Sequence, residues 1–149
     1  MTQSVISFEE LRNKDVAIVG GKNASLGEMI SQLKAKGVRV PTGFATTADA
    51  FNEFLAQDQL GKRIEQELAD LDINDVVKLA QSGKKIRKWI LDTPFSSDFE
   101  NSIKNHYESL IKRSPKGTTF AVRSSATAED LPDASFAGQQ ESFLNIHGL

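Results

Sequence analysis

The 149-residue sequence predicts one domain of mixed α and β structure. Three observations support this fold class. Apolar residues recur at helical spacing in several segments, and short β-prone runs separate some of these segments. The last part of the sequence holds two further β-prone segments, which a long loop joins. The length is close to that of a typical single domain and allows a sizeable core.

The composition excludes several classes of protein. Hydrophobic residues make up 39% and charged residues 26%, and no apolar run approaches the ~18 residues that a membrane span needs. The start lacks the basic and apolar regions of a signal peptide, and cysteine is absent, so we expect a cytoplasmic protein without disulfides. The formal charge of −2 gives no broad basic field for nucleic acid. Residues 84–116 hold eight basic and four acidic residues, which we interpret as solvated helix faces.

The first elements are expected to be a strand, a glycine turn and a helix. Residues 16–19 form a short β-prone run that ends at Gly20-Gly21. Gly37 is expected to close the helix, and residues 44–46 can form another strand. The helix is predicted from apolar residues at helical spacing, namely Leu26, Met29, Ile30 and Leu33.

Three further helical regions are predicted between residues 47 and 113. Thr47 is a plausible N-cap, and the amphipathic pattern after it runs as far as Leu68. Asn74 or Asp75 can begin the next region, which Ser82-Gly83 could divide into two helices. Ser97 and Glu100 have capping-box spacing at the start of the last region. Its apolar stripe consists of Phe99, Ile103, Tyr107, Leu110 and Ile111.

The end of the sequence predicts a turn and two strands. Pro115-Lys116-Gly117 is the turn, and residues 118–122 and 142–146 are the β-prone segments. The sequence stops directly after the second strand signal, although an exposed strand is usually covered by further structure. We therefore expect the chain to be a piece of a longer protein.

Gly20-Gly21-Lys22 is the first candidate anion site. Amides at a helix N-terminus and a lysine can share one anion. The segment is not a Walker motif, because Val16 occupies the place of its first glycine and Asn23 follows the lysine. An ordinary turn with a solvent-facing lysine is the alternative interpretation.

Arg123 is the second candidate, because a guanidinium can grip phosphate oxygens with two hydrogen bonds and stays charged. Ser124 and Ser125 can add hydroxyl or amide donors. The alternative is a strand-end arginine paired with Glu129 or Asp130.

The loop that follows can approach a ligand closely, because residues 135–140 contain one glycine, Gly138, and two small residues. Ser142 and its neighbours can add polar contacts, although a simple hairpin connection explains them equally well. No metal is assigned to the acids of this loop, which are interpreted as solvated. His106 and His147 lack neighbours suited to nucleophilic or general-base work and are interpreted as surface or packing residues.

Three blocks, at residues 20–29, 40–47 and 120–146, closely resemble the N-terminal region of the phosphoenolpyruvate synthase family. The resemblance implies an α+β fold, with helices packed on a small, mostly antiparallel sheet, and makes residues 1–149 the first portion of an ATP-grasp-type domain. Similar domains occur in pyruvate, phosphate dikinase and rifampicin phosphotransferase. The resemblance further implies that Lys22 and Arg123 contact ATP phosphates. It also implies that the loop through Gly138 covers them, and that Ser142 stands where the family has a small hydroxyl residue.

The family reaction converts ATP, pyruvate and water to phosphoenolpyruvate, AMP and phosphate through a phosphohistidine, and it serves gluconeogenesis. The resemblance implies that the histidine domain, the pyruvate-binding domain and the Mg²⁺ ligands lie outside this chain. No catalytic residue is expected in it, and the chain alone is expected to be inactive. Two alternatives stay open: the same module of a rifampicin phosphotransferase, or a stand-alone nucleotide-binding module.

Overall fold

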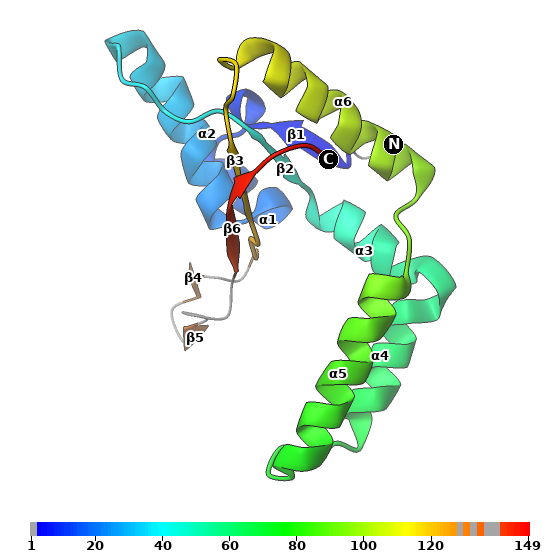
Figure 1. The fold of residues 1–149 in the computed structure, drawn as a ribbon. Helices are drawn as coiled ribbons and strands as arrows, with labels where there is room; N and C mark the ends of the chain where they lie inside the picture. Colours follow the sequence, from blue (N-terminus) through cyan, green and yellow to red (C-terminus); the bar gives the residue numbers. More distant parts are fainter. Residues whose placement is uncertain (1–2, 128–129, 132–133, 136–140) are drawn as a thin grey trace. The chain divides into compact units, whose positions relative to one another are not determined.

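The computed structural model of the chain divides into two compact units (Figure 1). It describes residues 3–127, 130–131, 134–135 and 141–149. The first unit comprises Met1–Ala50 and Asp98–Leu149, and the second comprises Phe51–Ser97. The division falls inside one helix and at the start of another, which explains why no linker composition marks it in the sequence.

The first unit begins with a two-stranded antiparallel sheet of β1 (Val5–Ser7) and β2 (Phe44–Thr46), in which Val5 lies opposite Thr46. The prediction of β2 is confirmed. The strand β1 was not predicted from the sequence. A helical segment connects the two strands: η1 (Phe8–Glu10), η2 (Asn13–Asp15), α1 (Val16–Val19), α2 (Gly21–Leu33) and η3 (Lys34–Lys36).

The predicted strand at residues 16–19 is wrong, because these residues form the single helical turn α1. The amide of Gly20 donates to the carbonyl of Val16 at 2.8 Å and closes this turn. Val19 is buried, whereas Val16 and Ile18 are 38% and 43% exposed. A four-residue apolar run fits a strand and a buried helical turn equally well, and here the packing of Val19 overrides the β propensity.

The core of the first unit lies between α2 and the segment that precedes α1. Leu11, Val19, Ala24 and Ala45 form a buried cluster, with Ile6 and Phe8 packed against it. The helix approaches closely because it presents a glycine to Leu11: a Cβ added to Gly27 would lie 2.5 Å from Leu11 Cβ. The prediction of α2 is confirmed, and Gly37 ends the helical segment with φ +77°.

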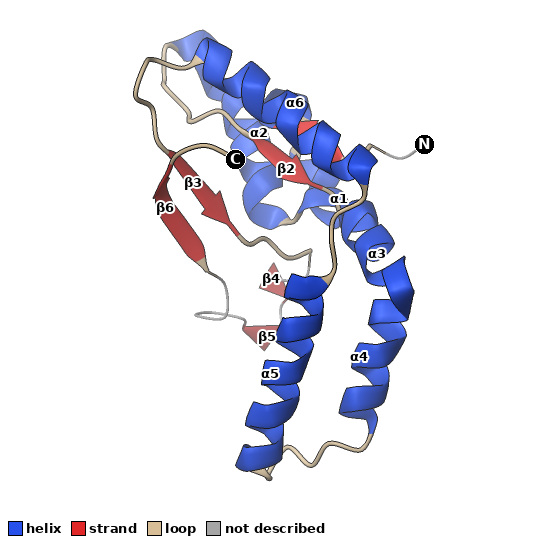
Figure 2. Ribbon diagram, turned by 45° about the vertical axis from the view of Figure 1, so that its right-hand side comes forward, coloured by secondary structure: helices blue, strands red, loops and turns tan. Residues whose placement is uncertain are grey.

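The long helix α6 (Ser97–Arg113) packs beside the strands of the first unit (Figure 2). The ring of His106 lies 5.7 Å from that of Phe44, and its Nδ1 is 2.8 Å from the carbonyl oxygen of Ser102. Tyr107 stacks edge-on against Phe120 with 5.3 Å between the ring centres. Tyr107 and the buried Leu110 of the predicted apolar stripe thus belong to the packing face, as does His106, whereas Ile111 is 45% exposed.

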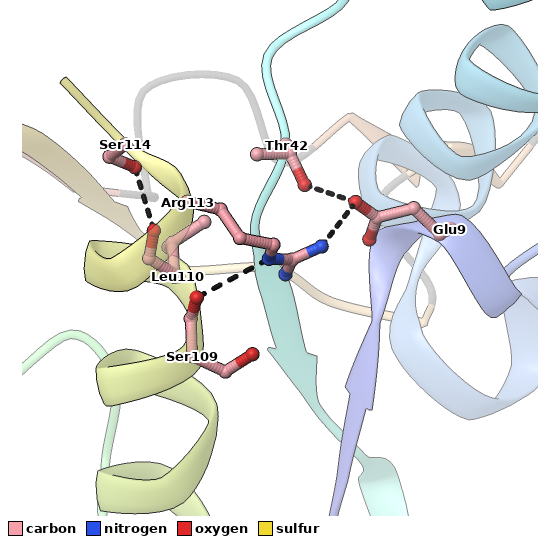
Figure 3. A network of polar contacts seen from close by, with 6 residues as sticks. All are labelled: Glu9, Thr42, Ser109, Leu110, Arg113 and Ser114. Atoms are coloured by element: carbon pink, nitrogen blue, oxygen red, sulfur yellow. Dashed lines mark hydrogen bonds and ion pairs between the residues drawn. The ribbon is translucent and has the colours of Figure 1, made fainter.

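A polar network joins the end of α6 to the start of the chain (Figure 3). Glu9 Oε1 accepts a hydrogen bond of 2.6 Å from Thr42 Oγ1 and lies 3.4 Å from a guanidinium nitrogen of Arg113. Burial acts to raise the pKa of Glu9. The hydrogen bond from Thr42 and the charges of Arg113 and Lys34 outweigh it and lower the pKa below its ordinary value of 4.5.

Glu9→Gln is expected to reduce stability at pH 7 by about 1 kcal/mol, and this loss is expected to be smaller at pH 3 than at pH 7. A carboxyl with a lowered folded-state pKa stabilises the fold above its unfolded pKa, and this contribution disappears as the pH falls through the folded pKa. Urea unfolding at pH 7 and pH 3 measures the difference, with Glu10→Gln as the matched change of charge. A loss that is equal at both pH values would contradict the role of the charge.

The second unit is a pair of packed helices. The preceding helix α3 (Ala48–Ala56) begins in the first unit, and the amide of Ala50 donates to Thr47 Oγ1 at 3.2 Å, which confirms the predicted N-cap. The 3₁₀ turn η4 (Gln57–Gln59) leads to α4 (Leu60–Ala69), and α5 (Val76–Asp92) follows. Asp75 caps α5, which is continuous through Ser82-Gly83, so the pattern here encodes one helix.

Side chains on facing sides of α4 and α5 hold the pair together. The guanidinium of Arg63 lies 4.5 Å from the centre of the Trp89 ring, and Glu67 pairs with Lys85 and accepts from Ser82. The eight basic residues between positions 84 and 116 are all exposed, which confirms their interpretation as solvated. No helix in the described part of the chain is both long and apolar enough to cross a membrane.

The remaining strands form two further antiparallel pairs, so the described strands make three small separate sheets. The bounds are β3 (Phe120–Arg123) with β6 (Ser142–Ile146) and β4 (Asp130–Leu131) with β5 (Ala134–Ser135). The predicted turn at Pro115-Lys116-Gly117 is confirmed, since the amide of Thr118 donates to the carbonyl of Pro115. The α+β fold with antiparallel strands is therefore confirmed.

Candidate functional site

Arg123 and Ser142 lie directly opposite each other at one end of the β3–β6 ribbon. Opposite residues of an antiparallel pair present their side chains on the same face. Pairing continues one residue further, because the amide of Ser124 donates to the carbonyl of Glu141 at 3.1 Å and the amide of Glu141 donates to Ser124 Oγ at 2.9 Å. The ribbon therefore brings together two of the predicted site residues that are far apart in the sequence.

The other end of the ribbon contains an irregularity that a single asparagine accommodates. The register shifts between the pairs Phe120–Ile146 and Val122–Phe143. Asn145 lies in this bulge with φ +57°, a conformation that asparagine tolerates better than most residues. The bulge leaves the register at Arg123 and Ser142 regular.

The predicted glycine turn is present, and it connects two helices. Gly20 has φ +82° and ψ 159°, a region that is essentially restricted to glycine, and it is the N-cap of α2. Lys22 is exposed in the first turn of α2. The amides and the positive end of the helix dipole at this place favour an anion, and the lysine adds a full charge.

The turn and the ribbon meet at one close contact. Ser125 Oγ donates to the carbonyl of Val19 at 3.0 Å. A Cβ added to Gly20 would lie 2.3 Å from Ser125 Oγ and 2.7 Å from the carbonyl oxygen of Ala126. Only a residue without a side chain lets the two segments come this close.

This contact places the two predicted cations in one neighbourhood. Lys22 is two residues beyond Gly20, and Arg123 is two residues before Ser125, so each backbone lies within about 7 Å of the contact. Both residues are exposed, as is Ser142. The fourth predicted residue, Gly138, lies outside the described residues, as do Glu129 and the side chain of Asp130, the alternative partners of Arg123. The arrangement can offer two cations and helix amides to one anion.

Several features of the site were not predicted from the sequence. The hydroxyls of Ser124 and Ser125, expected as donors to a ligand, are bonded within the chain. The carbonyl of Val19 also accepts from Asn23 Nδ2 at 2.8 Å. The glycine pair signalled a tight turn, but no local pattern links it to a serine so distant in the sequence. Among the described residues, no three histidines or acids gather as a metal site would require.

Comparison with known proteins identifies the family. The model of the family described as "Pyruvate phosphate dikinase, AMP/ATP-binding domain" matches residues 16–149. The chain belongs to this family. Nucleotide phosphates are anions, and helix N-termini, lysine and arginine are groups that bind anions.

Curated relatives of the chain are phosphoenolpyruvate synthases. It is 61% identical to that of Neisseria meningitidis serogroup B and 57% identical to that of Escherichia coli K12, in each case over 97% of this chain and 18% of the relative. It is 52% identical to that of Pseudomonas aeruginosa over 100% of this chain and 19% of the relative. The chain thus spans about a fifth of the length of these relatives.

Proposed function

We propose that the chain is the ATP-binding portion of a phosphoenolpyruvate synthase and that it binds the phosphates of ATP beside the contact of Gly20 with Ser125. This contact is the observation that supports the proposal, because it joins the segments of the backbone that carry Lys22 and Arg123, in a chain of the AMP/ATP-binding family. The names of the relatives favour this function over a rifampicin phosphotransferase module.

Each proposed residue has a distinct task. Lys22 neutralises phosphate charge at the start of α2, where the helix amides add donors. Arg123 offers a planar fork for two phosphate oxygens, and Ser142, opposite it in the ribbon, supplies a hydroxyl on the same face. The loop through Gly138 is proposed to cover the phosphates and to offer backbone amides to them. Phosphoryl transfer depends on such positive charge and aligned donors around the oxygens.

The proposal for the whole protein extends beyond this chain. There, ATP, pyruvate and water would give phosphoenolpyruvate, AMP and phosphate, and a histidine of another domain would carry the phosphoryl group. Magnesium ligands, the histidine domain and the pyruvate site are proposed to lie outside residues 1–149, so that this chain alone is inactive. Magnesium, when bound, would neutralise phosphate charge. The cytoplasmic location and the role in gluconeogenesis stay predictions.

Titration of the ¹⁵N-labelled chain with Mg-ATP tests the proposal directly. The largest amide shift changes are expected in residues 20–24, 123–126 and 141–142. Changes confined to the basic residues of α5 and α6 would instead indicate nonspecific attraction between charges and would contradict the proposed site.

Arg123→Ala is expected to weaken ATP binding by roughly 10- to 100-fold, because a charge-assisted hydrogen bond is worth about 1.5–3 kcal/mol. Arg87→Ala is the matched control, since Arg87 is an arginine of α5, in the other unit of the chain. In the full-length protein the same pair of variants should differ in ATP-dependent phosphorylation of the histidine. Equal effects of the two changes on ATP affinity would remove Arg123 from the proposed site.

A further inference from the structure

We infer that Asn23 and Ser125 are positioning residues that set the spacing of the two phosphate-binding cations by holding one backbone atom, the carbonyl oxygen of Val19. The inference rests on the proposed function and adds two residues to it. Neither side chain is assigned to the nucleotide itself. Each acts through the segment that carries a cation.

The carbonyl of Val19 needs partners from outside its own helix. Val19 is the last residue of α1, and the chain leaves the helical path at Gly20 (φ +82°, ψ 159°). The carbonyls at a helix C-terminus lack intrahelical donors, and Val19 is 4% exposed. A carbonyl oxygen has two lone pairs, and the structure supplies two side-chain donors to it.

The two donors come from the two halves of the proposed site. Asn23 lies in the first turn of α2, next to Lys22, and its Nδ2 reaches back to the oxygen at 2.8 Å. Ser125 lies two residues beyond Arg123, and its Oγ reaches the same oxygen at 3.0 Å. One atom therefore ties the lysine-bearing helix to the extension of the arginine-bearing strand.

The surroundings of the Val19 carbonyl explain how these two hydrogen bonds can fix the spacing between Lys22 and Arg123. The packing is tight on the side of Gly20, because a Cβ added there would lie 2.3 Å from Ser125 Oγ and 2.7 Å from the carbonyl oxygen of Ala126. On the other side, the ribbon is stiffened by the two hydrogen bonds between Ser124 Oγ and the backbone of Glu141. Loss of either donor to Val19 leaves the cations present but frees their relative position, and positioning is what simultaneous contact with several phosphates requires.

The test compares ATP with AMP, because only ATP spans several phosphates. Ser125→Ala and Asn23→Ala are each expected to weaken Mg-ATP binding about fivefold, the effect of one hydrogen bond, and to change AMP binding less than about twofold. Ser125→Thr keeps the hydroxyl and should restore the ATP to AMP affinity ratio. Ser114→Ala is the control, since it also removes a hydroxyl bond to a carbonyl, that of Leu110 at 2.8 Å at the end of α6.

The outcomes separate this inference from the proposed function. Affinities come from NMR titration of each variant, whose amide spectrum also reports folding. If the unsubstituted chain does not bind ATP, the proposed function fails and the inference falls with it. If it binds ATP but Ser125→Ala leaves the ratio unchanged, or weakens ATP and AMP equally, the positioning role alone is overturned. If the ratio of ATP to AMP affinity falls in Ser125→Ala and recovers in Ser125→Thr, the positioning role is supported.

Discussion

Gly20→Ala is expected to destabilise the first unit by about 4 kcal/mol and to abolish measurable ATP binding, the largest effect that we predict for a single substitution. Two independent costs add. The backbone of Gly20 has φ +82° and ψ 159°, and a residue with a Cβ in this region carries a strain of about 1–3 kcal/mol. The new Cβ would also stand 2.7 Å from the carbonyl oxygen of Ala126, a backbone atom that cannot turn aside.

The second cost links stability to binding. To make room for the Cβ, the segment of Ser125 and Ala126 must move away from the turn, which breaks the hydrogen bond to Val19 and separates Arg123 from Lys22. Overpacking of this kind costs about 1–3 kcal/mol in a well-packed site. Because both cations are needed for the phosphates, the shift should be more damaging to ATP affinity than to the remaining fold.

A second glycine of the chain provides the control for backbone strain. Gly37 has φ +77°, but an added Cβ would meet no atom within 4 Å. Gly37→Ala is therefore expected to cost only about 1 kcal/mol, from the left-handed conformation, and to leave ATP affinity unchanged. Urea unfolding followed by amide signals of residues 3–50 gives the free energies. Similar losses in the two variants would show that contact with Ser125 and Ala126 contributes nothing.

The sequence predicted the elements that have a strong local signal. The helices α2 and α6 carry long apolar stripes, and Thr47 and Asp75 are capping residues whose side chains accept helix amides in the structure. Such signals arise within one or two turns, so they can be read without knowledge of the rest of the chain. The antiparallel arrangement of strands came from the family resemblance, since local pattern gives strands but not their partners.

The errors lie where packing decides between two local possibilities. The run at residues 16–19 is helical because Val19 reaches the core cluster from a helical turn, and β1 is a strand because it pairs with β2, which is distant in the sequence. A possible break at Ser82-Gly83 is absent, since Ser82 is buried and bonds to Glu67 across the helix pair. In each case the structure is decided by contacts with other elements, which periodicity within one segment does not reveal.

In the candidate site too, the sequence predicted single residues, whereas contacts between distant elements could not be predicted. Lys22, Arg123 and Ser142 were chosen from residue chemistry and from the resemblance, and the structure brings Arg123 and Ser142 together through strand register. The contact of Gly20 with Ser125 could not be predicted, because it depends on how the ribbon meets the helices. Because of this contact, Asn23 and Ser125 become candidates for residues that position Lys22 and Arg123, although neither has an evident affinity for phosphate.

Leu11→Ala is expected to destabilise the first unit by about 3 kcal/mol, the second largest effect on stability. Leu11 is 1% exposed and belongs to the buried cluster with Val19, Ala24 and Ala45. Truncation removes apolar atoms from the core and leaves a cavity, and the two costs add to about 2–5 kcal/mol for a buried leucine. The backbone around Leu11 cannot easily collapse into the gap, because Gly27 already lies in close contact with Leu11 Cβ and its carbonyl.

The comparison with Leu91→Ala separates the core effect from the loss of a leucine as such. Leu91 is 84% exposed, so its truncation should change the free energy of unfolding by less than about 0.5 kcal/mol.

Leu11 shares its cluster with Val19 and Ala24, which flank the glycine turn on both sides. Below the unfolding transition, however, ATP affinity should stay within about twofold of the unsubstituted chain, because the hydrogen bonds to the Val19 carbonyl remain. A large loss of affinity in a folded Leu11→Ala variant would mean that the core, and not the two donors, sets the position of the turn.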